Sequence, residues 1–164
     1  MCIRDRICSD QARFGFVFAK RGIVPEAASS WFLPRLIGIN KALELCYTGK
    51  VISAEEAKEI KLVSEILNQD KLIDRALEIA KEFTAESSQI SIALTRQIMW
   101  RMLGADDPIE AHKIDSRAVF ELGQSGEAIE GVNSFLEKRP PSFPGKVSKD
   151  MPSFFPWWDE KEFE

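Results

Sequence analysis

The feature of this sequence that most constrains its fold is a succession of helical patterns over residues 70–139. From Asp70, apolar residues recur at spacings of three and four, which is typical of one face of an amphipathic helix. The segment 88–103 is apolar over a wider arc, which indicates packing on two sides. Asp107 followed by Pro108 predicts an N-cap with proline in the first turn of a third helix, and a fourth follows. We therefore expect a mostly helical body.

The residues before this body carry shorter signals. The segment 12–18 is aromatic and β-branched, which predicts an extended stretch, and 62–67 is a candidate short strand. Pro25 suits either the first turn of a helix or the loop just before one, and Pro34 is expected to end or kink that helix. Ser53, with a glutamate three places on, predicts a capping box. A short β-containing part should therefore precede the helical body.

Composition narrows the classes of protein that this chain can represent. Its 164 residues suit one domain or a part of a larger one, and a hydrophobic fraction of 45% is enough to bury a core. The net charge of -4 gives no electrostatic support for binding nucleic acid. No apolar run approaches the roughly 18 residues of a membrane span, and the polar first residues do not form a secretory signal.

Cysteine and histidine usage bears on metals, nucleophiles and compartment. Cys2, Cys8 and Cys46 are odd in number and lack metal-type spacing, which predicts free thiols in a reducing cytoplasm. His112 is the only histidine, so a catalytic triad or a histidine-rich metal site has little support. We therefore expect no metal and no separate cofactor.

One carboxylate stands out in "RGIVPEAASSWFLPRLIG", where Glu26 follows proline and precedes two alanines and two serines. Two interpretations of Glu26 are open. A glutamate in the first turn of a helix is common, because its charge complements the helix dipole. Alternatively, Glu26, which precedes an aromatic and leucine-rich segment, is a general acid or base. Spacing by itself favours the first interpretation.

Three stretches carry recognisable motifs: "ARFGFVFAKRGIVPEAASSWFLPRLIG", "ALELCYTGKVISAEEAKEIKLVSEIL" and "EAIEGVNSFLEKRPPSF". Together they resemble the crotonase family, the enoyl-CoA hydratase/isomerase superfamily. The second is similar to the family's A-x-E-x-x-x-T-G-x-x-I-x-A-x-E-A-x-x-x-G-L-V signature, with Lys61 in place of the usual glycine. Their order and spacing fit over Ala12 to Phe143. The resemblance is specific for the superfamily and says little about the reaction.

This resemblance implies an α/β crotonase (ββα spiral) fold, truncated, of which the part present is mostly α-helical with a short β remnant. Residues 1–10 would be a remnant or a non-native leader, and 11–69 the end of the spiral core with the active-site loop. Residues 70–139 would be the C-terminal helical region of a homotrimer or dimer of trimers. A proline-rich and aromatic tail, 140–164, should cover the body or a neighbouring subunit. Only the C-terminal half of the family fold would then be present.

The resemblance also assigns roles to single residues. Hydratases of the family use a glutamate at the position of Phe18, and an aromatic ring cannot exchange protons. The segment "FAKRGIVPEAASS" is instead similar to the F-x-x-L-G-x-x-P-E-G-x-S-S pattern of Δ3,Δ2-enoyl-CoA isomerases, in which the glutamate is the single proton shuttle. Glu26 is therefore the candidate general acid/base, with Ala27 replacing a glycine. An apolar pocket would suit a carboxyl group that takes up and returns a proton, and five aromatic residues could build it: Phe14, Phe16, Phe18, Trp31 and Phe32.

The remaining implied contacts concern the substrate, an acyl-CoA thioester. In the family, a lysine at the position of Lys138 reaches the CoA phosphates, although a basic residue at a helix end is also favourable without any ligand. Phe120 or Val119 would lie near the adenine, unless they simply pack in the core. The reaction would be hydration or isomerisation of an enoyl-CoA. A non-catalytic crotonase-like helical module, which binds partners through the C-terminal helices and the tail, is the alternative.

Overall fold

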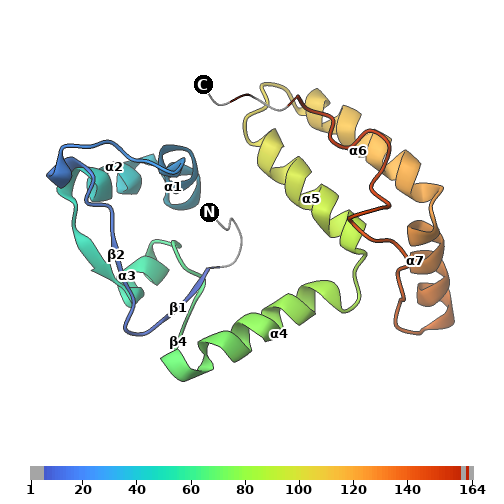
Figure 1. Ribbon diagram of the computed structural model, residues 1–164, viewed down its shortest axis with the longest axis horizontal. Helices are drawn as coiled ribbons and strands as arrows, with labels where there is room; N and C mark the ends of the chain where they lie inside the picture. Colours follow the sequence, from blue (N-terminus) through green and yellow to red (C-terminus); the bar gives the residue numbers. More distant parts are fainter. Residues whose placement is uncertain (1–5, 160–161, 163–164) are drawn as a thin grey trace. The chain divides into compact units, whose positions relative to one another are not determined.

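The structure is a computed structural model that describes residues 6–159 and residue 162 (Figure 1). The chain divides into two compact units, unit 1 (Met1–Ile79) and unit 2 (Ala80–Glu164), and each has a buried core of its own. Helices dominate both units, and the strands are short and confined to unit 1 among the residues described. The expectation of a mostly helical chain with a short β portion is therefore confirmed.

Unit 1 contains two small sheets. Strand β1 (Ile7–Ser9) pairs in parallel with β4 (Glu65–Leu67), and β2 (Arg13–Gly15) pairs in an antiparallel manner with β3 (Val51–Ser53). The extended stretch predicted from residue 12 is therefore only three residues long. After it, the chain turns into the 3-10 helix η1 (Ala19–Arg21).

The last predicted strand of unit 1 is also shorter than expected, and the cause is local. Lys61 is left-handed, with φ of 63°, directly after helix α3 (Ala54–Glu59). The Leu62 N–H donates to the carbonyl of Ala57 and the Lys61 N–H donates to the carbonyl of Lys58, which closes the end of that helix as a Schellman motif. Lys61 thus occupies the position where a glycine is usual, and only Glu65–Leu67 remain for the strand.

Two helices of unit 1, α1 (Ser29–Ile37) and α2 (Ile39–Thr48), pack against each other with Gly38 between them (Figure 1). Pro34 lies inside α1, so the expectation that it ends the helix is wrong, and a kink at this position stays a prediction. Its missing N–H leaves only the carbonyl of Ser30 without a helical donor, and Ser30 is exposed to water. The helix stops at Gly38, where φ is 80° and the N–H donates to the Pro34 carbonyl.

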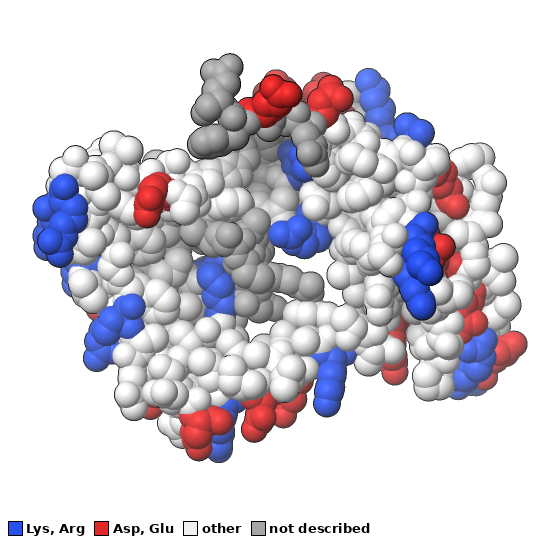
Figure 2. Space-filling view, viewed as in Figure 1, with Lys and Arg blue, Asp and Glu red and all other residues white. Residues whose placement is uncertain are grey.

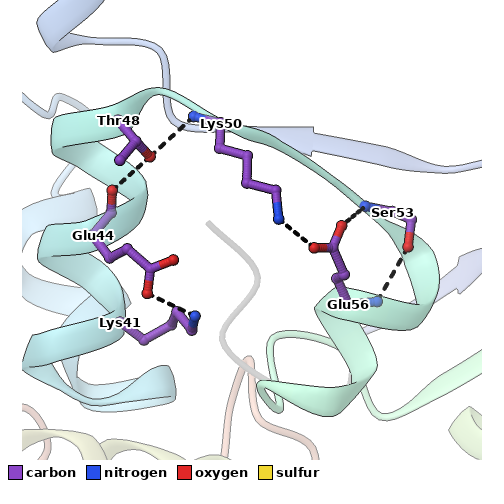
Figure 3. A network of polar contacts seen from close by, with 6 residues as sticks. All are labelled: Lys41, Glu44, Thr48, Lys50, Ser53 and Glu56. Carbon is purple, nitrogen blue, oxygen red and sulfur yellow. Dashed lines mark hydrogen bonds and ion pairs between the residues drawn. The ribbon is translucent and has the colours of Figure 1, made fainter.

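The predicted capping box at the start of α3 is present. The Ser53 hydroxyl accepts the Glu56 N–H, and the Glu56 carboxylate accepts the Ser53 N–H. Figure 3 shows the polar network around it, in which the Lys50 ammonium also reaches Glu56 at 2.5 Å. On α2, the Thr48 hydroxyl donates to the Glu44 carbonyl and accepts the Lys50 N–H. The network thereby links the end of α2 to the start of α3.

Unit 2 is built on three helices, and the predicted N-cap at Asp107 is present. They are α5 (Gln89–Met102), α6 (Pro108–Gly123) and α7 (Gly126–Glu137), capped by Ser88, Asp107 and Ser125. Helix α5 packs on α6, and α6 packs on α7. Unit 1 also contains η2 (Gln69–Lys71) and the first part of α4 (Leu72–Thr84), whose last residues belong to unit 2, and no residue of α4 is buried. None of the helices that the structure describes is long and apolar enough to cross a membrane.

The aromatic tail covers its own unit, which confirms the intramolecular form of that prediction. Phe154 is buried against Ile90, Leu94 and Ala118, and the tail runs along α5 and α6 in Figure 1. The Arg101 guanidinium lies 3.2 Å above the centre of the Trp158 ring. Residues beyond the helices therefore complete the core of unit 2.

Candidate functional site

Glu26 lies in the loop between η1 and α1, outside any helix. Of the two placements open for Pro25, the structure has the loop just before the helix, because α1 begins only at Ser29. The interpretation of Glu26 as a first-turn helix residue is therefore wrong. The loop begins where the Phe18 carbonyl accepts the N–H groups of Arg21 and Ile23.

The backbone between Glu26 and α1 is strained. Ala27 and Ala28 are both left-handed, with φ of 49° and 56°. For a residue with a Cβ this conformation costs roughly 1–2 kcal/mol. Alanine at position 27, where the isomerase pattern has glycine, therefore carries a conformational cost.

Ser29 holds the strained turn from its far side. Its N–H and its hydroxyl both donate to the Glu26 carbonyl, at 2.8 Å and 2.6 Å. The Ser29 side chain is buried, whereas Glu26 is exposed. Glu26 therefore lies at the surface, whereas Ser29, which closes the turn through its hydrogen bonds, is buried.

An apolar cavity of about 420 Å³ opens beside this loop within unit 1. One wall comes from the loop and the start of α1, and it includes Pro25 and Ser29, which flank Glu26 in the sequence. The opposite wall comes from α2. The full lining is Ala19, Ile23, Val24, Pro25, Ser29, Ser30, Leu33, Pro34, Ile39, Ala42, Leu43, Cys46 and Tyr47. Glu26 itself is not among the lining residues, but it is exposed on the loop between the lining residues Pro25 and Ser29, and the space suits an apolar group.

This cavity differs from the aromatic pocket that the sequence predicts, because its lining is mainly aliphatic. Phe14 and Phe16 pack against the core of unit 1 instead. Phe18 is half-buried at the start of η1. Trp31 is 42% exposed, and the Arg35 guanidinium lies 3.3 Å from the centre of its ring. The roles of Phe18 and Trp31 in binding a substrate stay predictions.

Lys138 and Phe120 belong to unit 2 and take no part in the lining of this cavity. Lys138 follows the end of α7, is left-handed with φ of 54°, and is exposed. Phe120 on α6 is 68% exposed, and its neighbour Val119 is exposed too. Neither Phe120 nor Val119 is therefore packed in the core of the described chain, and whether they contact the substrate or another subunit stays a prediction.

Sequence reasoning missed the α2 side of the cavity. Ile39, Leu43 and Tyr47 are spaced by four, so they share one helix face, and this spacing could have revealed a second apolar face beside the buried Ala42 and Leu45. Cys46 also lines the cavity and is a free thiol, and burial raises its pKa.

The distribution of charged side chains and of potential metal ligands bears on whether the chain has a second kind of site. Figure 2 shows, on the face that it draws, Lys and Arg side chains at separate positions among acidic ones. Within residues 6–159 and 162, no three His, Cys, Asp or Glu side chains are grouped to hold a metal ion. Cys2 lies outside the described residues.

Comparison with known proteins shows the family to which the chain belongs. Residues 2–146 match the family model described as enoyl-CoA hydratase/isomerase. The chain belongs to the enoyl-CoA hydratase/isomerase family. The match covers most of the chain, extends on both sides of the stretch Ala12 to Phe143 that carries the resemblance, and reaches into residues 1–10.

Individual relatives of the family agree with this assignment. The chain is 42% identical over 139 residues to the enoyl-CoA hydratase ACTT3 of Alternaria alternata, which covers 84% of this chain and 46% of that protein. It is 30% identical over 146 residues to the 1,2-epoxyphenylacetyl-CoA isomerase of Escherichia coli, covering 85% and 53%. The chain thus spans about half the length of the curated relatives it matches.

The fold agrees as well. The crystal structure of the enoyl-CoA hydratase of Bacillus anthracis superposes with a TM-score of 0.80 at 32% identity, over 87% of this chain and 54% of that one. The similarity in fold therefore accompanies a sequence similarity that runs through both units.

Proposed function

We propose that this chain is the C-terminal half of an acyl-CoA enzyme of the enoyl-CoA hydratase/isomerase type, in which Glu26 is the general acid/base. The observation that carries the proposal is the position of Glu26, which is exposed on a constrained loop whose neighbours Pro25 and Ser29 line an apolar cavity. The apolar cavity would take part of the acyl group, and CoA would supply the thioester as part of the substrate. No separate cofactor is required.

The proton transfer that we propose needs a single carboxylate. Glu26 takes a proton from the carbon next to the thioester carbonyl, and the electron pair moves into the carbonyl to form an enolate. The protonated Glu26 then returns the proton at the γ-carbon, which shifts the double bond and restores the carboxylate. Donors to the enolate oxygen stabilise its charge. In hydration, Glu26 would instead assist the addition of water across the double bond.

Phe18 supports isomerisation over hydration, because it stands where hydratases of the family have a second glutamate. We further propose that the donors to the enolate oxygen lie outside these 164 residues. The isolated chain would then not turn over an enoyl-CoA. Detectable turnover of a 2- or 3-enoyl-CoA by the purified 164-residue chain would contradict this part of the proposal.

The decisive experiment changes Glu26 to glutamine in the complete natural protein that carries this sequence. Both hydration and Δ3,Δ2 isomerisation are assayed. We expect kcat to fall by about 100-fold or more, in line with the contribution of a positioned acid/base. Glu86→Gln, at an exposed position between α4 and α5, is the matched control and should leave both rates unchanged. Equal rates for Glu26→Gln and the unaltered protein would remove Glu26 from the mechanism.

The CoA moiety would bind through unit 2, with Lys138 attracting its phosphates and Phe120 lying near the adenine. The exposure of both side chains supports this assignment. Lys138→Ala should raise KM for the acyl-CoA and become less harmful as salt is added, because exposed charge pairs are screened by ions. A salt-independent effect would argue for a structural role instead.

The apolar surface of α6 and α7 supports two further proposals, which differ in the partner. It is formed by Val119, Ile129, Val132, Phe135 and Leu136, all exposed. We propose that it forms the contact of a homotrimer or dimer of trimers. The alternative is a non-catalytic helical module that binds another protein through the same surface. Light scattering and an activity assay of the natural protein that carries this sequence separate the two proposals. A trimer or hexamer with Glu26-dependent activity supports the enzyme, and an inactive monomer supports the module.

A further inference from the structure

Ser29 stands out because its buried side chain is hydrogen-bonded to the backbone of Glu26, the proposed general acid/base. Its hydroxyl donates to the Glu26 carbonyl at 2.6 Å, and its N–H donates to the same oxygen at 2.8 Å. Two donors from one residue fix both the distance and the direction of that carbonyl. Only 5% of Ser29 is exposed, so water is a poor substitute for the hydroxyl.

The segment between the two residues is constrained as well. Ala27 and Ala28 are both left-handed, and the Ala28 carbonyl accepts the N–H groups of Trp31 and Phe32 at 2.9 Å and 3.1 Å. Pro25 precedes Glu26, and its ring fixes its own φ. Strained backbone that surrounding bonds hold in place is typical of sites where geometry must be kept. Glu26 is therefore bounded on both sides by residues with little conformational freedom.

We propose that Ser29 is a positioning residue for Glu26, and that the left-handed pair Ala27–Ala28 is the turn through which it acts. The inference rests on the proposed function, since it needs Glu26 to transfer the proton. Ser29 does not exchange protons with the substrate. It anchors the Glu26 backbone to the start of α1, so that the carboxylate samples a small region at the edge of the cavity.

The test uses Ser29→Ala in the natural protein that carries this sequence, with Ser29→Thr as the conservative variant. Misplacement of a catalytic group by about 1 Å can cost about 100-fold in rate. We expect Ser29→Ala to lower kcat by about 10- to 100-fold with KM changed less than about twofold, and Ser29→Thr to restore most of kcat because it retains the hydroxyl. Ser64→Ala is the matched control. Its exposed hydroxyl also donates to a main-chain carbonyl in unit 1, that of Arg6, but far along the chain from Glu26.

A second readout separates positioning from general structure. If Ser29 acts through Glu26, Ser29→Ala should cost little further activity in a Glu26→Gln background, because residues that act as a unit are not additive. An equal loss of kcat in both backgrounds would overturn the inference. If Glu26→Gln is itself fully active, the proposed function fails. If Glu26→Gln is inactive and Ser29→Ala is fully active, only the positioning role fails.

The turn gives a third, independent test. Ala28→Val should lower kcat, because a β-branched residue strongly disfavours positive φ. Ala28→Gly keeps the conformation accessible and should keep kcat within about threefold while relieving strain. Thermal unfolding of each variant shows whether it is folded. A folded Ala28→Val protein with unchanged kcat would show that the left-handed turn does not matter for Glu26.

Discussion

Glu127 on α7 offers the sharpest stability test, because it is a carboxylate that is only 5% exposed inside unit 2. It accepts the Ser88 hydroxyl and the Gly145 N–H, the latter at 2.7 Å. Ser88 is also the N-cap of α5, where it accepts the Ser91 N–H. One carboxylate therefore joins the start of α5, the start of α7 and the beginning of the tail.

The expected effect of Glu127→Ala follows from these contacts. Hydrogen bonds to a charged group contribute about 1.5–3 kcal/mol each, and Glu127 makes two of them. Part of this loss is offset because a buried charge is removed. We therefore expect the free energy of unfolding of unit 2 to fall by about 2–3 kcal/mol. Glu127→Gln retains one carbonyl oxygen and should lose about half as much.

The assay combines urea denaturation, followed by circular dichroism, with hydrogen exchange at the Gly145 amide. That amide should lose protection in Glu127→Ala, because its acceptor is gone. Glu86→Ala, an exposed glutamate of the same unit, is the control and should remain within about 0.5 kcal/mol of the unaltered chain. The reasoning is refuted if Glu127→Ala is as stable as that control and the Gly145 amide stays protected.

Three further outcomes are expected. Arg139 and the Ser142 N–H lower the pKa of Glu130 from 4.5 to about 2. The contact therefore stabilises the fold above about pH 4.5, and this stabilisation is lost as the pH falls towards 2. Acid unfolding of Glu130→Gln should lack the loss of stability between these two pH values. Because burial raises the pKa of Cys46, its alkylation at pH 7 should be slower than that of a small-molecule thiol. An apolar molecule in the cavity should slow the alkylation further. A rate equal to that of the small-molecule thiol, or one that the apolar molecule does not change, would contradict the corresponding prediction. Phe154→Ala should destabilise unit 2 by about 3–5 kcal/mol, measured by urea denaturation, whereas Met99→Ala at a 67% exposed site should change it by under about 0.5.

Much of the helical architecture could be predicted because its causes are local. Ser53 with Glu56, and Asp107 with Pro108, satisfy backbone donors a few residues away, so their effect is written in short stretches of sequence. The burial of Phe154 could be anticipated for a similar reason, since a cluster of aromatic residues rarely stays in water. The prediction was less accurate where one residue decides, as at Lys61, whose left-handed backbone shortens the following strand.

The candidate site shows the division between sequence and tertiary structure most clearly. The sequence by itself determined the order of the family motifs and singled out Glu26, because motif spacing along the chain does not depend on packing. Tertiary structure alone decided that Glu26 lies outside the helix, that Ala27 and Ala28 are left-handed, and that an aliphatic cavity replaces the aromatic pocket. Alanine gives no sign of positive φ in a sequence. The cavity arises from the packing of α1 on α2, a contact between helices that no local pattern encodes.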